Sequence, residues 1–74
     1  MRIETGPRKT PDGYYLIVVE GSDHELGVVE QLAAEAGAEV ERAGNVLFIK
    51  VKSRSLRDKL YRRMKRSFAE ARSQ

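Results

Sequence analysis

The chain of 74 residues contains no cysteine, one histidine and two prolines. Without cysteine, neither a disulfide nor a thiolate metal site can stabilise the fold. His24 has no second histidine with which to complete a metal site. We therefore expect no metal and no cofactor, and the lack of cysteine suits a reducing, cytoplasmic location.

Long apolar runs are also missing, since the longest covers only residues 14–19. A helix needs about 20 such residues to span a bilayer, so we expect no membrane partner. The start of the chain has no signal-peptide pattern. We expect residues 1–74 to form one domain, and a domain this small often gains stability from a partner.

Charge is divided unevenly along the chain, although the net charge is only +3. Residues 1–49 carry four Lys or Arg and nine Asp or Glu, a net charge of −5. Residues 50–74 carry ten basic and two acidic residues, a net charge of +8. This separation suggests an anionic partner for the basic part. The alternative is internal compensation, in which the basic helix lies near an acidic one.

Residues 14–20 are the clearest predicted strand, because they are β-branched and aromatic and are bounded by glycines. Both faces of this strand are apolar, so the pattern leaves open which one is buried. Residues 2–5 would form an edge strand beside it. The rest of residues 1–13 carries turn signals and predicts a flexible or hairpin-forming segment.

A helix is predicted over residues 23–36. Ser22 and Glu25 have the spacing of a capping box at its start. Gly37 is placed as the left-handed residue that ends it. Gly27 lies inside the helix, where a small residue would allow the sheet to approach closely.

A hairpin is predicted for residues 38–43 and 46–52, around Gly44 and Asn45, which both tolerate the positive φ of a tight primed turn. This register places one apolar set of cross-strand pairs toward the helices: Ala38 with Val51, Val40 with Ile49, and Arg42 with Leu47. The opposite face pairs Glu41 with Phe48 and Glu39 with Lys50, and is expected to be solvated.

A second helix is predicted near residues 53–72, capped by Ser53 or Ser55. Its apolar residues recur at steps of four: Leu56, Leu60, Met64 and Phe68. The rest of its surface is cationic, with these candidate RNA-binding residues: Lys59, Arg62, Arg63, Lys65 and Arg66. Arg57 falls inside the apolar sector, so it must extend its charged end to water or pair with a carboxylate, such as one on the first helix.

The predicted fold class is α+β, a two-layer sandwich of order β-α-β-β-α. Its antiparallel sheet has two helices on one face and a fourth, N-terminal strand if residues 2–5 pair. The other face is left open and carries a candidate interface: Tyr14, Leu16, Val18, Val46 and Phe48. An adjacent apolar group of this kind indicates a contact surface, and we expect the partner to be a second copy or a paralogous subunit. The alternative is that the N-terminal segment folds over it.

The basic helix favours structured RNA such as tRNA as its partner. Like charges at four-residue spacing, as in Lys59 with Arg63 and Arg62 with Arg66, cost a few tenths of a kcal/mol each. Phosphate groups would offset this cost, and binding would weaken steeply with salt. The alternative partner is an acidic protein.

Signals of catalysis are poor. His24 stands at a helix start, where a polar residue is ordinary, and Ser22 has no neighbouring base in a recognised order. We therefore expect neither an enzyme nor a small-molecule substrate. Residues 14–40 resemble an ACT domain, which would imply a ligand-binding regulator as a further alternative.

The C-terminal half carries one further pattern. Its last strand leads into a helix that begins with a Leu-Arg pair, and the matching residues are Leu47, Ile49, Val51, Leu56, Arg57, Leu60, Met64 and Phe68. In this the chain resembles the small dimerising subunit of the KEOPS complex, which helps to make the threonylcarbamoyl modification of tRNA. The resemblance implies a non-catalytic accessory subunit that dimerises and helps to hold tRNA.

Overall fold

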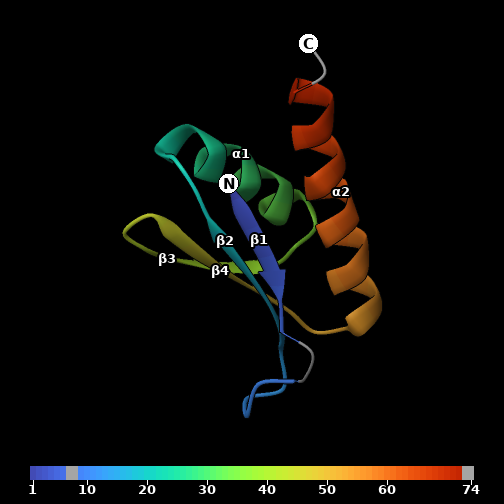
Figure 1. Ribbon diagram of the computed structural model, residues 1–74. Helices are drawn as coiled ribbons and strands as arrows, with labels where there is room; N and C mark the ends of the chain where they lie inside the picture. The colour runs from blue at the N-terminus through green and yellow to red at the C-terminus, as the bar shows by residue number, and fades with distance from the viewer. Residues whose placement is uncertain (7–8, 73–74) are drawn as a thin grey trace.

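The computed structural model describes residues 1–6 and 9–72 of the chain, with side chains up to Phe68. It contains four strands and two helices in the order β-β-α-β-β-α (Figure 1). Their bounds are β1 Arg2–Thr5, β2 Tyr15–Glu20, α1 Asp23–Glu35, β3 Glu39–Ala43, β4 Val46–Val51 and α2 Arg54–Arg72. The predicted α+β class and element order are confirmed, and residues 2–5 do form the additional N-terminal strand.

The four strands make one antiparallel sheet of order β1-β2-β4-β3. The predicted hairpin register is confirmed, with Val40 opposite Ile49 and Glu41 opposite Phe48. The chain leaves β2 through α1 and returns through the β3–β4 hairpin, which places β4 beside β2 in the centre. The edge strands are therefore β1 and β3.

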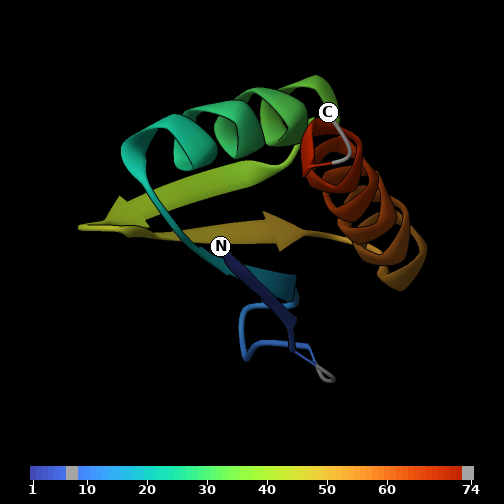
Figure 2. The same cartoon turned by 45° about the horizontal axis from the view of Figure 1, so that its top comes forward.

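Both helices cover the same face of the sheet, so the protein has two layers (Figures 1 and 2). Helix α1 packs over β3 and β4, while α2 packs over β1, β2 and β4. Among the described side chains, the core between the layers consists of ten buried residues: Ile17, Val19, Leu26, Val29, Ala33, Leu47, Ile49, Val51, Leu60 and Met64. The face of β2 that the sequence left undecided is thereby settled, because Ile17 and Val19 point inward.

Local signals fix the ends of the helices. The Glu25 amide donates a hydrogen bond to the Ser22 hydroxyl and the Ser22 amide donates to the Glu25 carboxylate, so the predicted capping box is confirmed. Ser53, rather than Ser55, caps α2, because its hydroxyl accepts a hydrogen bond of 3.0 Å from the Leu56 amide. Gly37 has a φ of +74°, as the predicted left-handed stop requires.

Two local predictions are wrong in detail. A Cβ atom added to Gly27 would have no neighbour within 4 Å, and the residue is exposed, so its small size does not serve close approach of the sheet. In the hairpin turn only Gly44 has a positive φ, of +62°. Asn45 does not use its tolerance of that region, because a glycine at the first central position alone satisfies one of the two tight hairpin turns.

Candidate nucleic-acid interface

Helix α2 is held to the sheet by one narrow side. Leu60 and Met64 are 2% and 0% exposed and face the core, and Phe68 packs beside them. Since an α-helix turns by about 100° per residue, this anchoring fixes which residues face away. The helix is therefore a rigid support for its outward side chains, and its orientation follows from the apolar residues at steps of four.

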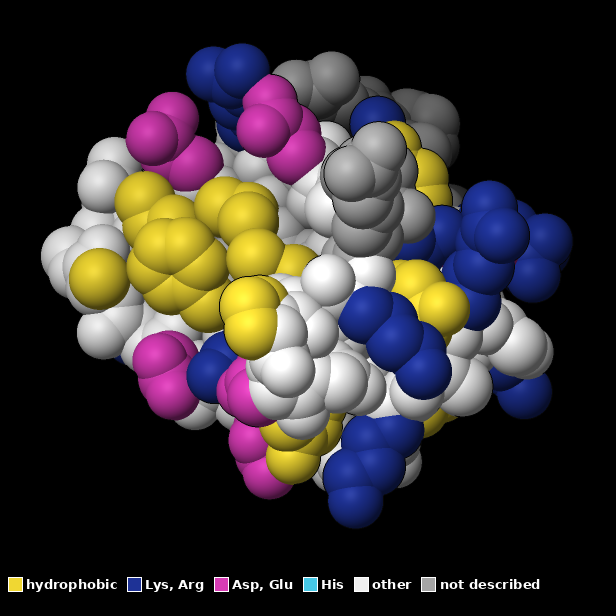
Figure 3. All heavy atoms as spheres, turned by 90° about the horizontal axis from the view of Figure 1, so that it is seen from below, with side chains coloured by type: hydrophobic (Ala, Val, Ile, Leu, Met, Phe, Trp, Pro, Cys, Tyr) yellow, Lys and Arg dark blue, Asp and Glu magenta, His cyan; other side chains and the backbone are white. Residues whose placement is uncertain are grey.

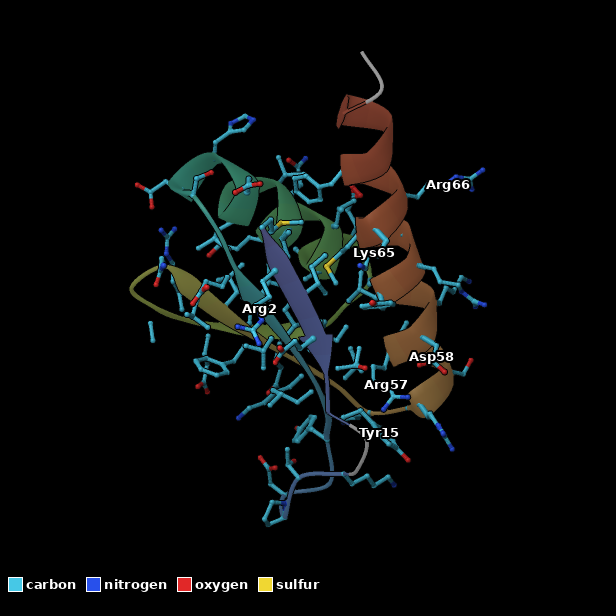
Figure 4. The ribbon with its side chains drawn as sticks, viewed as in Figure 1. Arg2, Tyr15, Arg57, Asp58, Lys65 and Arg66 are labelled. Carbon is cyan, nitrogen blue, oxygen red and sulfur yellow. The ribbon has the colours of Figure 1, made fainter. Side chains whose placement is uncertain are left out.

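The five predicted RNA-binding residues are all exposed on α2: Lys59, Arg62, Arg63, Lys65 and Arg66. Lys59, Arg62 and Arg66 form the central row, because they follow one another at steps of three and four. At 1.5 Å per residue, this row extends roughly 10 Å along the helix axis. Arg66 projects away from the sheet (Figure 4). The structure thus brings the five cations together on one element and places three of them in line.

The two flanks of this row have partners within the molecule, and so does Arg66 in the row itself. Arg63 lies 3.4 Å from the Glu35 carboxylate of α1, and the Lys65 ammonium lies 5.5 Å from the centre of the Tyr61 ring. Within residues 1–6 and 9–68, Lys59 and Arg62 form no ion pair. Compensation of α2 by an acidic α1 is thus limited, among these residues, to the pair of Arg63 and Glu35.

Arg57 has a different role from the other cations of α2. It is 6% exposed, and its guanidinium donates hydrogen bonds to the Asp58 carboxylate at 2.9 and 3.0 Å and to the Gly6 carbonyl at 2.7 Å. The guanidinium also lies 5.3 Å from the centre of the Tyr15 ring (Figure 4). The expected pairing with a carboxylate is confirmed, but the carboxylate is Asp58 of α2 itself and not one on α1, because Arg57 faces the segment that follows β1. This residue joins α2 to the N-terminal segment.

Two further cations extend the basic surface toward the start of α2. Lys52 directly follows β4, and Arg54 is the first residue of the helix; both are exposed. Periodicity did not select these two residues, because they precede the apolar repeat that defines the outward side of the helix. Their presence in the strongly basic C-terminal segment was the signal that could have identified them.

The five predicted interface residues also come together, on the sheet face that the helices do not cover. Tyr14, Leu16, Val18, Val46 and Phe48 are half-buried. Val18 and Phe48 are direct neighbours across β2 and β4. Apolar side chains gather on the left of Figure 3, with most Lys and Arg side chains on the right. We call these five residues the apolar patch. Of the N-terminal segment, residues 2–5 pair as β1 at the edge of the sheet, and Asp12 of the following loop reaches this face beside Lys50.

Carboxylates surround the apolar patch. The register places Glu4 and Glu41 on either side of Val18 and Phe48, while Glu20 and Glu39 lie further along the same face. Arg2 pairs with Glu4 at 2.6 Å. Lys50 lies 3.5 Å from Glu41 and 3.8 Å from Asp12. We call the four glutamates the acidic rim.

Asp12 belongs to the loop beside this face. A hydrogen bond from the Thr10 hydroxyl lowers the pKa of the Asp12 carboxyl below its ordinary value, and the Lys50 ammonium adds to the lowering. Asp12 therefore remains ionised to a lower pH than an ordinary aspartate and supports the negative charge at the edge of the sheet.

The remaining candidate groups lie apart from both surfaces. His24 is exposed in the first turn of α1. Among the described residues, no three His, Cys, Asp or Glu side chains come together as a metal site would require. Neither helix, within the part of the chain described, combines the length and apolar character needed to cross a bilayer.

Comparison with known proteins adds no relationship: no family model, no curated protein and no solved structure matches this chain. The resemblance to the small KEOPS subunit therefore stays a prediction that rests on residues 46–68.

Proposed function

We propose that this protein is a non-catalytic, cytoplasmic RNA-binding accessory subunit, and that α2 contacts the phosphates of structured RNA such as tRNA. The observation that carries the proposal is the row of Lys59, Arg62 and Arg66 on the outward side of a helix anchored by its other side. Phosphate contacts supply most of the sequence-independent affinity of proteins for nucleic acids. By the KEOPS resemblance, the assembly would be one that makes the threonylcarbamoyl modification of tRNA.

The shape of the surface favours a base-paired stem over a flexible single strand. Proteins that bind single strands combine a basic groove with aromatic side chains on which bases stack. Here the cations lie on a convex helix, and the neighbouring ring, Tyr61, is half-buried beside Lys65. A row of cations without a stacking platform suits the regular phosphates of a stem, which proteins recognise mainly by shape.

A tRNA gel shift over a salt series tests the proposal. We expect the double variant Arg62→Ala, Arg66→Ala to weaken binding roughly tenfold to a hundredfold at 0.1 M salt. The slope of log K against log salt should fall by about two, one for each lost contact.

The matched control is the double variant Arg2→Ala, Arg42→Ala. It removes the same charge, but both arginines are exposed and pair with carboxylates away from α2, Glu4 and Asp23. We expect it to leave the salt slope unchanged. Absence of tRNA binding at low salt, or equal weakening by both double variants, would falsify the RNA-binding function.

A second candidate is a protein-interaction module without a role on RNA. The uncovered apolar patch favours it, since adjacent apolar side chains on one surface commonly mark a contact with another protein. An RNA-binding helix and a protein-binding sheet lie on different faces, so the two activities are compatible in one accessory subunit.

A further inference from the structure

The uncovered face of the sheet has an apolar centre and an acidic border. The apolar patch follows the two central strands, from Tyr14, which directly precedes β2, to Val18, and from Val46 to Phe48 on β4. The edge strands carry the border, with Glu4 on β1 and Glu39 and Glu41 on β3. In Figure 3, acidic side chains lie above and below the apolar group. The two kinds of side chain together define the chemistry of an occupant.

The balance of charge on this face is negative. The acidic rim supplies four carboxylates, while Arg2 and Lys50 supply two cations, each already paired with Glu4 or Glu41. Glu20 and Glu39 form no ion pair within residues 1–6 and 9–68. Glu20 and Glu39, one at each end of the face, can therefore pair with cations of a partner molecule.

The negative charge of this face favours some kinds of binding partner over others. RNA phosphates would meet carboxylates across a short distance, and like charges repel there. A second copy stacked face to face about a two-fold axis would place one acidic rim near another, because such an interface brings the same surface of both chains together. A positively charged protein segment would gain from both the border and the apolar centre.

The dimensions suit a helix. The edge strands β1 and β3 lie three strand spacings apart, about 14 Å, and an α-helix with its side chains is about 10–12 Å wide. The apolar segment from Tyr14, which directly precedes β2, to Val18 extends about 13 Å, which matches between two and three helical turns. A helix along the central strands would thus lie between the carboxylates of the two edges.

A hollow at one end of the face fits a lysine side chain. It has a volume of about 140 Å³ and is lined by Arg2, Glu4, Val18, Glu20 and Val46. The two valines provide apolar surface for the methylene stem, and Glu20 provides a carboxylate for the ammonium group, while the charge of Arg2 is paired with Glu4. Lysine commonly buries its stem along apolar surface in this way while its charge stays at the rim.

We propose that the uncovered sheet face binds an amphipathic helix of a partner protein, in which a row of large apolar side chains is flanked on both sides by Lys or Arg. Phe48 and Val18 contact the apolar row, and Glu20 and Glu39 pair with the flanking cations. This site is separate from α2 and does not depend on RNA binding.

Two synthetic helices of about 18 residues, long enough to fold, test the proposal. Both carry leucine at positions i, i+3, i+4 and i+7; one has lysine at the flanking positions and the other has glutamate. Fluorescence anisotropy with the full chain should show binding of the lysine helix alone. Phe48→Ala should weaken that binding about tenfold or more, as loss of a central aromatic contact does. Glu20→Gln with Glu39→Gln should weaken it less and flatten its salt dependence.

Controls keep folding separate from binding. Val18→Thr removes apolar surface while keeping a β-branched residue suited to a strand, and it should weaken binding in the same direction as Phe48→Ala. Val28→Ala, which trims a half-buried side chain on α1 away from this face, should leave binding unchanged.

Three results would overturn the proposal. The first is no binding of the lysine helix, or equal binding of both helices. The second is a dimer in light scattering that Phe48→Ala disperses, since the occupant would then be a second copy. The third is loss of tRNA binding in Phe48→Ala, because RNA would then occupy the sheet. A change of tRNA binding that occurs only in the α2 variants tests the RNA-binding function and says nothing about the helix site on the sheet.

Discussion

The two helices pack on the same sheet face, yet their outward sides differ. The solvent side of α1 is mixed and carries no lysine or arginine: Asp23, His24, Gly27, Gln31, Ala34 and Glu35. The described exposed side chains of α2 include six cations, which are the five predicted ones and Arg54, and one carboxylate, Asp58. Contact with water alone requires only the first kind of surface. The cations of α2 therefore exceed what solvation of a helix needs, and this excess supports the proposed contact with a polyanion.

The largest expected change in stability distinguishes Arg57, which has a structural role, from the outward cations of the same helix. Arg57→Ala should lower the free energy of unfolding by about 2–3 kcal/mol, because it leaves a cavity beside Tyr15 and removes the donors to Asp58 and the Gly6 carbonyl. Urea unfolding followed by circular dichroism measures it. Arg62→Ala is the matched control and should change stability by less than about 0.5 kcal/mol. Equal losses in both variants would mean that α2 has no division between structural and outward cations.

A substitution on the solvent side of α1 is expected to change stability less, and to increase it. Gly27→Ala should raise the free energy of unfolding by about 0.5–1 kcal/mol, because alanine favours the helix and the added Cβ has no neighbour within 4 Å. Thermal unfolding checks it, and tRNA binding by the variant should be unchanged. A decrease in stability would show that this side of α1 contacts something that its exposed position does not suggest.

The smallest change in stability is expected for the contact between the two helices. Glu35→Gln removes the exposed carboxylate 3.4 Å from Arg63, and exposed pairs contribute no more than about 1 kcal/mol. We expect a loss of about 0.5 kcal/mol or less in urea unfolding at low salt, and none at 1 M salt, where screening is nearly complete. A loss well above 1 kcal/mol at low salt that 1 M salt removes would mean that α1 does compensate the charge of α2, contrary to the comparison above.

Much of the fold could be predicted because its signals are local. The capping box of Ser22 and Glu25, the stop at Gly37 and the hairpin register are each set by residues close together in the chain. The element order followed from them. Arg57 could be identified as exceptional from its place in the apolar sector, but its partners, Gly6 and Tyr15, come from distant parts of the chain that no local pattern relates.

The candidate surfaces show the same division. Periodicity alone predicted which five cations face away from the apolar side of α2, since one buried stripe fixes the rest of a helix surface. The acidic rim could not be found in that way, because its four glutamates lie on three strands, β1, β2 and β3, which meet only through strand pairing.

The sequence by itself determined the elements, their order, the orientation of α2 and the separation of charge, because each depends on periodicity, capping residues or composition. Only the tertiary structure decided which face of β2 is buried. Both of its faces are apolar, so the choice depends on pairing with β4, where Ile17 meets Ile49 and Val19 meets Leu47 beneath the helices. That choice leaves Leu16 and Val18 on the uncovered face and brings the carboxylates of the edge strands around them.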